Sequence, residues 1–250
     1  MTERITSSAN PVLKLIRSLG RDAAARRVSG LMLCEGRKAL DEALASGAEP
    51  AHVVIPDGCE DPSVRAARVI QTPRKLFDGL SALDAPQPLL FTVPLPDLSL
   101  RPLKAARPKC VVLDRLQDPG NVGSVIRTAC AMGIDAVLLT PGCADPSNPK
   151  TLRASAGTVF RVPIMRGAEE DLLKYLNETG LPVYTTGVSG QAVRLGDANL
   201  EGRAVVIGNE GAGVSDFWRE FQMLTIPMTG RCESLGAAVA AALIIWEMRA

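Results

Sequence analysis

Apolar residues along the chain alternate between short continuous runs and stretches with helical spacing. In the first hundred residues, the continuous runs predict strands at 31–34, 52–55, 69–71 and 89–93. Helical spacing predicts helices over 11–28, 36–46 and near 74–82. In the first helix, Asn10 suits the N-cap, Pro11 suits the first turn, and Gly20 interrupts the apolar stripe. The alternation of strands and helices predicts a small α/β domain.

The second half of the chain repeats this alternation more clearly. Continuous apolar runs predict strands at 110–114, 136–140, 160–164, 183–186, 204–208 and 224–227. Helices are predicted near 123–132, 169–177, 215–221 and 234–248. Continuously apolar strands are typical of a parallel sheet that is covered on both faces. Ligands of such open α/β sheets usually bind at the loops that follow the carboxyl ends of the strands.

A proline-rich stretch separates the two halves. Four prolines fall within residues 94–108, and proline removes backbone donors and disfavours regular elements. The stretch therefore predicts a linker at 97–108, between a first domain at 1–96 and a second domain at 109–250.

Composition excludes several classes of protein. The longest apolar stretch, 237–246, is too short to span a bilayer, and residues 1–5 lack the apolar core of a secretory signal. The six cysteines form no CxxC pair, and the single histidine, His52, excludes a multi-histidine metal site. We therefore expect a cytoplasmic protein with reduced thiols, no metal centre and no membrane partner.

Charge is distributed unevenly along the chain. Residues 1–109 carry 16 Lys and Arg against 12 Asp and Glu, a net of +4, although the whole chain carries only +1. A basic first half suggests a polyanionic partner, and a solvated helix face explains the same charge equally well.

Three segments combine a strand end with polar or glycine-rich residues and a following helix. In the first, 112–129, a turn at 118–121 precedes a helix that begins close to Asn121 and carries Arg127. The apolar neighbours of Arg127 indicate that its guanidinium points at something acidic, and a structural salt bridge to Asp114 or Asp118 is one explanation.

In the second segment, 205–215, glycines follow a buried strand, which lets backbone N–H groups approach a ligand. The GxxGxG spacing is neither a dinucleotide fingerprint nor a P-loop, and a tight turn alone also explains it. Glu210 lies between these glycines, where a carboxylate faces the ligand site. In the third segment, 225–240, Ser234 suits the N-cap of an alanine-rich last helix. These features predict an α/β ligand-binding domain with a basic companion, and a non-catalytic RNA-binding module remains an alternative.

The three segments resemble the SpoU (TrmH-like) branch of the SPOUT RNA methyltransferases. The family's Asn-x-Gly-x-x-x-Arg motif is matched by Asn121, Gly123 and Arg127, and its Gly-x-Glu-x-x-Gly motif by Gly208, Glu210 and Gly213. Its third motif is matched by Ile226, Pro227, Met228, Gly230, Ser234 and Leu235. At the next position the family usually has Asn, and this chain has Gly236.

The resemblance extends over nearly the whole chain. Residues 152–158 resemble the family's Arg-x-Ser-x-Gly stretch, and residues 5–11 with 33–36 resemble its ribosomal-protein-like substrate-binding domain. The resemblance implies an α/β fold with two parts. These are a C-terminal SPOUT domain, with a parallel sheet and a deep trefoil knot, and a small N-terminal α/β substrate-binding domain. It also implies an obligate homodimer whose active site takes residues from both subunits.

The resemblance further implies a function and a set of site residues. The function is methyl transfer from S-adenosylmethionine to a ribose 2′-hydroxyl of RNA, with large-subunit ribosomal RNA as the expected substrate; alternatives are a tRNA 2′-O-methyltransferase and a non-catalytic RNA-binding member. The expected catalytic residues are Arg127, Asn121, Glu210 and Ser234. The expected cofactor-binding residues are Thr186, Gly187, Gly208, Asn209, Gly211, Ile226, Met228, Leu235 and Gly236. The expected RNA-binding residues are Arg17, Arg26, Arg27, Arg37, Arg153 and Ser155.

Overall fold

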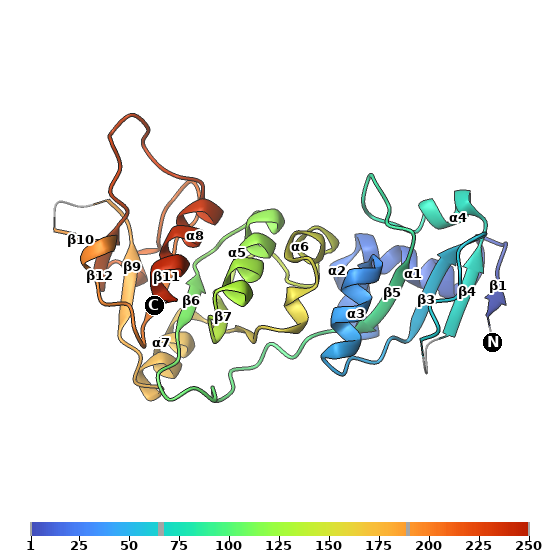
Figure 1. Ribbon diagram of the computed structural model, residues 1–250, viewed down its shortest axis with the longest axis horizontal. Helices are drawn as coiled ribbons and strands as arrows, with labels where there is room; N and C mark the ends of the chain where they lie inside the picture. The colour runs from blue at the N-terminus through green and yellow to red at the C-terminus, as the bar shows by residue number, and fades with distance from the viewer. Residues whose placement is uncertain (1, 65–67, 189–190, 250) are drawn as a thin grey trace. The chain divides into compact units, whose positions relative to one another are not determined.

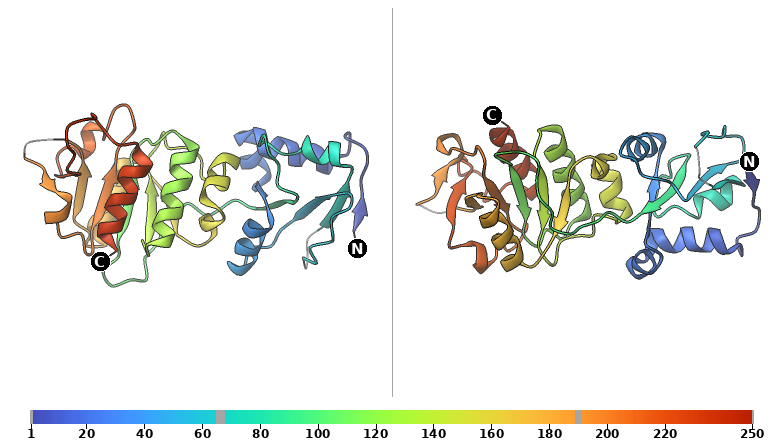
Figure 2. Two further views of the ribbon diagram at one scale, coloured as in Figure 1. Left: turned by 45° about the horizontal axis from the view of Figure 1, so that its top comes forward. Right: turned by 90° about the horizontal axis from the view of Figure 1, so that it is seen from below.

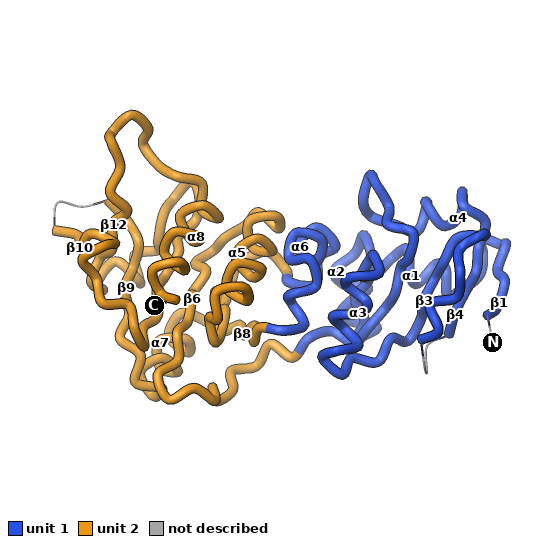
Figure 3. The backbone as a smooth tube through the Cα atoms, viewed as in Figure 1, with its two compact units in different colours: residues 1–96, 146–161 blue, residues 97–145, 162–250 orange. Residues whose placement is uncertain are grey.

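The computed structural model describes residues 2–64, 68–188 and 191–249. The chain divides into two compact units, unit 1 with residues 1–96 and 146–161, and unit 2 with residues 97–145 and 162–250 (Figure 3). Within the described ranges, no helix combines the length and the apolar character needed to cross a membrane.

Unit 1 contains a five-stranded mixed sheet in the order β1-β4-β3-β5-β2 (Figure 1). Its strands are β1 (Glu3–Arg4), β2 (Leu31–Glu35), β3 (His52–Pro56), β4 (Arg68–Thr72) and β5 (Leu90–Pro94). Its helices from the first 96 residues are α1 (Pro11–Arg21), α2 (Ala23–Ser29), α3 (Arg37–Ala45) and α4 (Arg74–Asp78). The small α/β domain expected from the sequence is therefore confirmed, with the short edge strand β1 as an addition.

The predicted helix at 11–28 is two helices, and the break between them is at Asp22. Asn10 caps α1 as expected, because its side chain accepts from the Val12 backbone N at 2.9 Å. Asp22 has extended backbone and caps α2 by accepting from Ala24 N at 2.7 Å. The capping carboxylate offers the backbone an alternative to the helical hydrogen bond, and this ends α1.

Two apolar clusters cover the two faces of the unit 1 sheet. Leu13, Ile16 and Leu19 of α1 pack with Phe77 on one face. On the other face, Leu40 and Ala43 of α3 pack with Phe91 and with Leu152. Unit 1 is thus a three-layer structure in which each helix stripe buries one side of the sheet.

Unit 2 contains a seven-stranded sheet in the order β10-β12-β9-β11-β6-β7-β8, and every pairing between these described strands is parallel. The strands are β6 (Cys110–Leu113), β7 (Ala136–Leu139), β8 (Ile164–Arg166), β9 (Val183–Thr186), β10 (Val193–Arg194), β11 (Ala204–Ile207) and β12 (Gln222–Thr225). The helices are α5 (Pro119–Ala131), α7 (Glu169–Glu178) and α8 (Ala237–Met248), with 3₁₀ turns η2 (Leu195–Asp197) and η3 (Asp216–Trp218). The predicted parallel sheet is confirmed.

Helices cover both faces of the unit 2 sheet. Leu172 and Leu176 of α7 pack against Cys110, Val112 and Leu138 on one face. Helices α5 and α8 lie side by side over the other face (Figure 2). Both faces are buried, which explains why β6, β7 and β11 are continuously apolar.

Several predicted elements of the second half are wrong in type or position. The predicted strand at 160–164 is a 3₁₀ turn, η1 (Thr158–Phe160), and the strand follows at β8. The predicted helix at 215–221 reduces to η3, whose Trp218 is fully buried. Helix α8 starts at Ala237 with Gly236 rather than Ser234 as N-cap, and α5 starts at Pro119 with Asp118 as N-cap. A single buried turn spaces its apolar residues as a short helix does. Over so few residues, the sequence pattern therefore does not distinguish the two.

The compact units differ from the predicted domains at residues 146–161, which the sequence assigns to the second domain. This segment contains α6 (Pro149–Ser155) and η1, neither of which was predicted. It belongs to unit 1 because Leu152, Val159 and Phe160 pack with the cluster that contains Leu40 and Phe91. Unit 1 is therefore built from two separate stretches of the chain.

Candidate active site

A cavity of about 470 Å³ lies at the carboxyl ends of three neighbouring strands of unit 2. Its walls come from the loops after β9, β11 and β12 and from the first turns of α8. Ala237, Ala240 and Ile244 of α8 line one side of it. The cavity therefore lies where open parallel sheets place their ligands.

This cavity collects most of the predicted cofactor-binding residues. Its lining includes Thr186, Gly187, Gly208, Asn209, Gly211, Ile226, Met228 and Leu235, and also the predicted catalytic residues Glu210 and Ser234. Gly236 lies next in sequence to Leu235 but is not among the lining residues. Sequence reasoning missed Val188 and Glu233, although Glu233 directly precedes the recognised Ser234.

Glycine is required at position 208 of the cavity wall because the backbone there passes close to other backbone atoms, whereas at Gly187 the crowding comes from a flexible side chain. A Cβ at Gly208 would lie 2.4 Å from the carbonyl carbon of Gly213, and one at Gly187 would lie 2.9 Å from Sδ of Met223. Asn209 and Gly213 exchange two backbone hydrogen bonds of 2.9 Å, so the glycines do form a tight turn. The same turn lines the cavity. The two explanations of the glycines, a tight turn and a close approach of the backbone to a ligand, are therefore compatible.

A short hydrogen bond connects α5 to this turn. The side-chain Nδ2 of Asn121 donates to Oε1 of Glu210 at 2.6 Å. Asn121 is in the first turn of α5, whose N-cap Asp118 accepts from the Asn121 backbone N at 2.8 Å. The bond brings the first recognised motif to the edge of the cavity.

Arg127 does not point at an acidic group of the described residues, although its apolar neighbours suggest that it should. Its side chain is exposed, and it forms no ion pair with any residue that the structure describes. The salt bridge to Asp114 or Asp118 is therefore wrong, because Asp114 pairs with Arg115 and Asp118 caps α5. Arg127 projects from the side of α5 and does not line the cavity.

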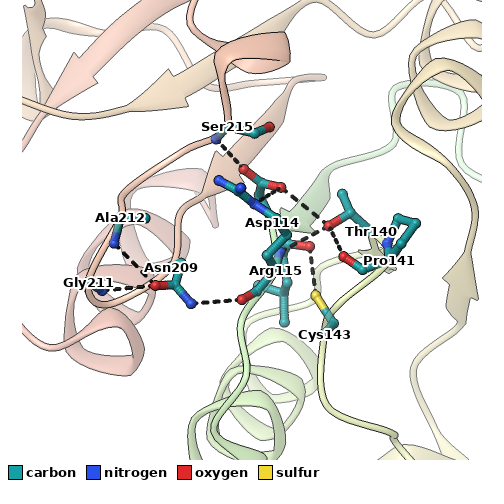
Figure 4. A network of polar contacts seen from close by, with 10 residues as sticks. Asp114, Arg115, Thr140, Pro141, Cys143, Asn209, Gly211, Ala212 and Ser215 are labelled. Atoms are coloured by element: carbon teal, nitrogen blue, oxygen red, sulfur yellow. Dashed lines mark hydrogen bonds and ion pairs between the residues drawn. The ribbon is translucent and has the colours of Figure 1, made fainter.

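A buried carboxylate holds the end of β6 against the strand ends beside it (Figure 4). Asp114 is fully buried and accepts from the Ser215 backbone N at 2.5 Å and from Oγ1 of Thr140 at 3.3 Å. The Nε of Arg115 lies 3.5 Å from the same carboxylate, and Arg115 itself has a φ of 55°. Charge and hydrogen bonds together compensate the burial of Asp114.

Asn209 ties the glycine-rich turn to this network (Figure 4). Its Nδ2 donates to the backbone O of Arg115 at 2.8 Å, and its Oδ1 accepts from the N of Gly211 at 2.9 Å and of Ala212 at 3.2 Å. Both ends of the amide are thus engaged within the protein.

Two of the predicted RNA-binding residues are buried within unit 1. Arg26 is 4% exposed, and its guanidinium donates to Ser147 Oγ at 3.1 Å and to Leu19 O at 2.9 Å. Ser155 is fully buried and donates to Leu152 O at 2.8 Å. Their assignment as RNA contacts is wrong, because these groups are satisfied inside the fold. Helix α2 is too short for its sequence to reveal which face turns inward.

The other four predicted RNA-binding residues have different degrees of exposure. Arg17 is half-buried and donates to Gly79 O at 3.2 Å. Arg27, Arg37 and Arg153 are exposed. Arg37 pairs with Asp41 at 2.8 Å, and Arg153 donates to Ala85 O at 3.0 Å. These four remain predictions.

Comparisons with known proteins agree with the recognised motifs. The SpoU rRNA methylase family model matches residues 108–246, and the MRM3-like substrate-binding domain model matches residues 10–90. A curated relative from Bacillus subtilis, named 23S rRNA (guanosine(2553)-2′-O)-methyltransferase RlmP, is 33% identical over 90% of this chain and 90% of its own length.

Solved structures with similar folds include two informative cases. The AdoMet-bound rRNA methyltransferase from Sinorhizobium meliloti has a TM-score of 0.85 and 28% identity, and the match covers 99% of this chain and 97% of that one. A structure that provides insights into the 2-OH methylation of C/U34 on tRNA has a TM-score of 0.51 and 30% identity. That match covers 58% of this chain and 95% of the other.

Fold and site together define a parallel α/β domain with a glycine-lined ligand cavity, joined to a substrate-binding domain. The chain belongs to the SpoU rRNA methylase family. The resemblance seen in the sequence motifs is thereby confirmed.

Proposed function

We propose that this protein transfers the methyl group of S-adenosylmethionine to a ribose 2′-hydroxyl of large-subunit ribosomal RNA. The observation that carries the proposal is the cavity of unit 2, which gathers Gly208, Glu210 and Ser234 from two recognised motifs beside one another. The scattered cysteines suit a reducing compartment, and we include a cytoplasmic location in the proposal.

The cavity residues fit S-adenosylmethionine. Gly187 and Gly208 line the cavity without a side chain, so a ligand can lie close to the backbone there. Ile226 and Leu235 supply apolar walls for an adenine ring. Glu210 and Glu233 place carboxylates at the lining, where they suit a cationic ligand.

The residues of this chain then have distinct parts in the reaction. When bound, S-adenosylmethionine supplies a methyl group that is activated by a positively charged sulfur. Arg127 keeps its positive charge in a protein, so we assign it to holding an RNA phosphate and stabilising negative charge on the 2′-oxygen. Asn121 orients Glu210 through its 2.6 Å hydrogen bond. Ser234 lines the cavity and is assigned to orienting the ribose or the cofactor.

The proposal includes a homodimer and a knotted second domain. Helix α8 exposes three large apolar side chains at helical spacing: Val239 at 54%, Leu243 at 42% and Trp246 at 51%. An apolar stripe of this kind suits an interface with a second copy of the chain. The exposed Arg127 would then act toward a site completed by the partner. The trefoil knot belongs to the proposal on the strength of the family membership and the parallel strand order.

A tRNA substrate is the second candidate. The structure connected with tRNA methylation matches 58% of this chain, whereas this chain also matches a substrate-binding domain model at residues 10–90. That additional domain favours a ribosomal RNA substrate. A non-catalytic RNA-binding role is the third candidate, because Gly236 departs from the family's usual Asn.

One experiment separates these candidates. Purified protein is incubated with tritiated S-adenosylmethionine and total RNA from a strain that lacks the gene, and the labelled RNA is fractionated and its 2′-O-methyl groups are mapped. We expect label in large-subunit ribosomal RNA at one ribose. Label confined to tRNA would support the second candidate. No label, with no heat in a calorimetric titration of S-adenosylmethionine, would support the third.

A further inference from the structure

A second cavity, of about 280 Å³, lies entirely within unit 1. It is bounded by the end of β2, the start of α3, the loop at 83–87 and the segment that carries α6 and η1. Its volume is just below the range of about 300–1,000 Å³ that is usual for ligand sites. The cavity therefore suits a small, flat group rather than a whole cofactor.

The walls of this cavity are mostly apolar. Leu33, Leu83, Leu152 and Phe160 all line it. Leu33 and Leu152 are buried, and Phe160 is half-buried, so part of its ring remains accessible. Apolar walls of this kind favour contact with the face of a planar ring, and an aromatic wall residue favours it most.

Three charged groups accompany these apolar walls. Glu35 is partly buried, and its carboxylate accepts from Ser81 Oγ at 2.5 Å and from the Gln87 backbone N at 3.4 Å. Burial raises the pKa of Glu35 despite these bonds. Lys38 and Arg153 also line the cavity and are exposed. A carboxylate inside the cavity would accept hydrogen bonds from N–H groups, and cations outside would donate hydrogen bonds to phosphates at the rim.

We propose that the cavity bounded by Glu35, Arg153 and Phe160 takes one unpaired nucleobase of the substrate RNA. The base lies against Phe160 and Leu152, an edge N–H group faces Glu35, and the neighbouring phosphates face Lys38 and Arg153. Proteins commonly recognise RNA by bases that are splayed out of loops and stacked on aromatic or guanidinium planes. This inference rests on the proposed function only in that the ligand is RNA.

The chemistry argues against a phosphate as the occupant. A phosphate inside the cavity would face the Glu35 carboxylate and the apolar side chains of Leu33 and Leu152, and both would disfavour it. Gly36 and Gly157 line the cavity with φ values of 92° and 88°, so side chains at these positions would be strained. A Cβ at Gly36 would also lie 3.1 Å from Gln87 Oε1. The cavity thus depends on two glycines.

Methyl NMR of the full chain tests the proposal without any substitution. Protein labelled at Leu and Val methyl groups is saturated with S-adenosylmethionine and titrated with each of the four nucleoside 5′-monophosphates, and separately with ribose 5-phosphate. We expect at least one mononucleotide to shift the methyl signals of Leu33, Leu83, Leu152 and Val159, and ribose 5-phosphate to leave them unchanged. Equal shifts with ribose 5-phosphate, or no shifts with any mononucleotide, would overturn the proposal.

A cavity-filling variant provides an independent test. Ala39 of α3 lines the cavity, and Ala45 of the same helix is exposed and does not. Ala39→Leu should weaken binding of a fluorescent RNA hairpin by about tenfold, on the order of one lost base-stacking contact, and should leave binding of a blunt RNA duplex unchanged. Ala45→Leu should bind both as the wild type does. Hairpin binding by Ala39→Leu within twofold of the wild type would contradict the proposal.

A failure of the base-binding proposal can be distinguished from a failure of the proposed function. Both variants are titrated with S-adenosylmethionine by calorimetry, which reports on unit 2 alone. If the wild type binds no cofactor, the proposed function fails, while the NMR result still decides on the base. If cofactor binding and methyl transfer are intact but Ala39→Leu binds hairpins normally, only the base-binding cavity fails.

Discussion

The side-chain amide of Asn121 and the carboxylate of Glu210 are 2.6 Å apart, although 89 positions of sequence separate the two residues. Asn121 begins α5, and Glu210 lines the cavity at the strand ends. The bond therefore connects the helix that carries Arg127 to the wall of the proposed cofactor site. It orients the carboxylate.

Arg127→Ala should abolish methyl transfer and leave cofactor affinity nearly unchanged. Arg127 does not line the cavity, so the affinity for S-adenosylmethionine should not depend on it. Loss of charge stabilisation of this kind typically lowers the rate by ~10²–10³. Tritiated-methyl incorporation and a calorimetric titration measure the two quantities. Incorporation above a tenth of the wild-type value would refute the assigned role.

The sequence predicts the parallel sheet and its glycine turn well because their signals are local. The apolar runs at β6, β7 and β11 and the glycines at 208–213 each carry their own pattern. Recognised motifs then identify the residues that the cavity collects, such as Glu210 and Ser234. These signals do not depend on distant parts of the chain.

Other features could not be predicted because they depend on distant contacts. Residues 146–161 pack into unit 1 through Leu152 and Phe160, and no periodicity within the segment indicates this. Arg26 is buried because Ser147, far away in the sequence, accepts its hydrogen bond. Arg127 is exposed although Ile126 and Ala129 beside it are buried, since a helix turns each side chain about 100° from the last.

Gly208→Ala should disrupt cofactor binding, and Gly211→Ala should be tolerated. A methyl group at position 208 would lie 2.4 Å from the Gly213 carbonyl carbon, so the turn would have to open. At position 211 the nearest atom is Asn209 Oδ1 at 3.6 Å, which is an ordinary contact. Calorimetric titration of both variants with S-adenosylmethionine makes the comparison. Equal affinities would show that the turn does not shape the cofactor site.

The wild-type protein should sediment as a homodimer at micromolar concentration, and Leu243→Asp should sediment as a monomer. Leu243 is in the middle of the exposed apolar stripe of α8, where a buried charge would be costly at an interface. Val28→Asp is the matched control, because Val28 is 90% exposed on unit 1. A wild-type species near 26.5 kDa that does not change with concentration would refute the dimer.

Glu35 should make folding less favourable as the pH rises. Burial raises the pKa of Glu35 in the folded protein above its usual value of about 4.3, so the proton binds more tightly to the folded state. The resulting stabilisation is present below the unfolded-state pKa and is lost as pH rises through the folded-state pKa. Glu35→Gln stays neutral, so its Tm should rise relative to that of the wild type from about pH 4 upward. The exposed Glu60→Gln serves as control, and parallel Tm curves for the wild type and Glu35→Gln would contradict the prediction.

Gly236→Asn should retain or raise activity, because it restores the side chain that the family motif usually has. A steric clash of Asn at this position would require a positive φ or crowded surroundings. Gly236 has a φ of −59°, and no atom outside its chain neighbours lies within 4 Å of a Cβ built there. The position is the N-cap of α8 and has no side-chain cap. Asn is a preferred N-cap residue, so the variant should also stabilise α8 by a few tenths of a kcal/mol.

Two measurements on the wild type and on Gly236→Asn test this prediction together: cofactor affinity and the rate of single-turnover methylation. The Asn amide can offer a donor and an acceptor beside the cavity wall at Leu235, which supports equal or higher activity. Cofactor binding more than tenfold weaker in the variant would mean that the glycine is an adaptation of this site, since the fold itself leaves the position open. Equal binding with a faster methylation step would instead show that the missing amide acts on the RNA or on the catalytic groups, because the cofactor would then be held equally well with and without it.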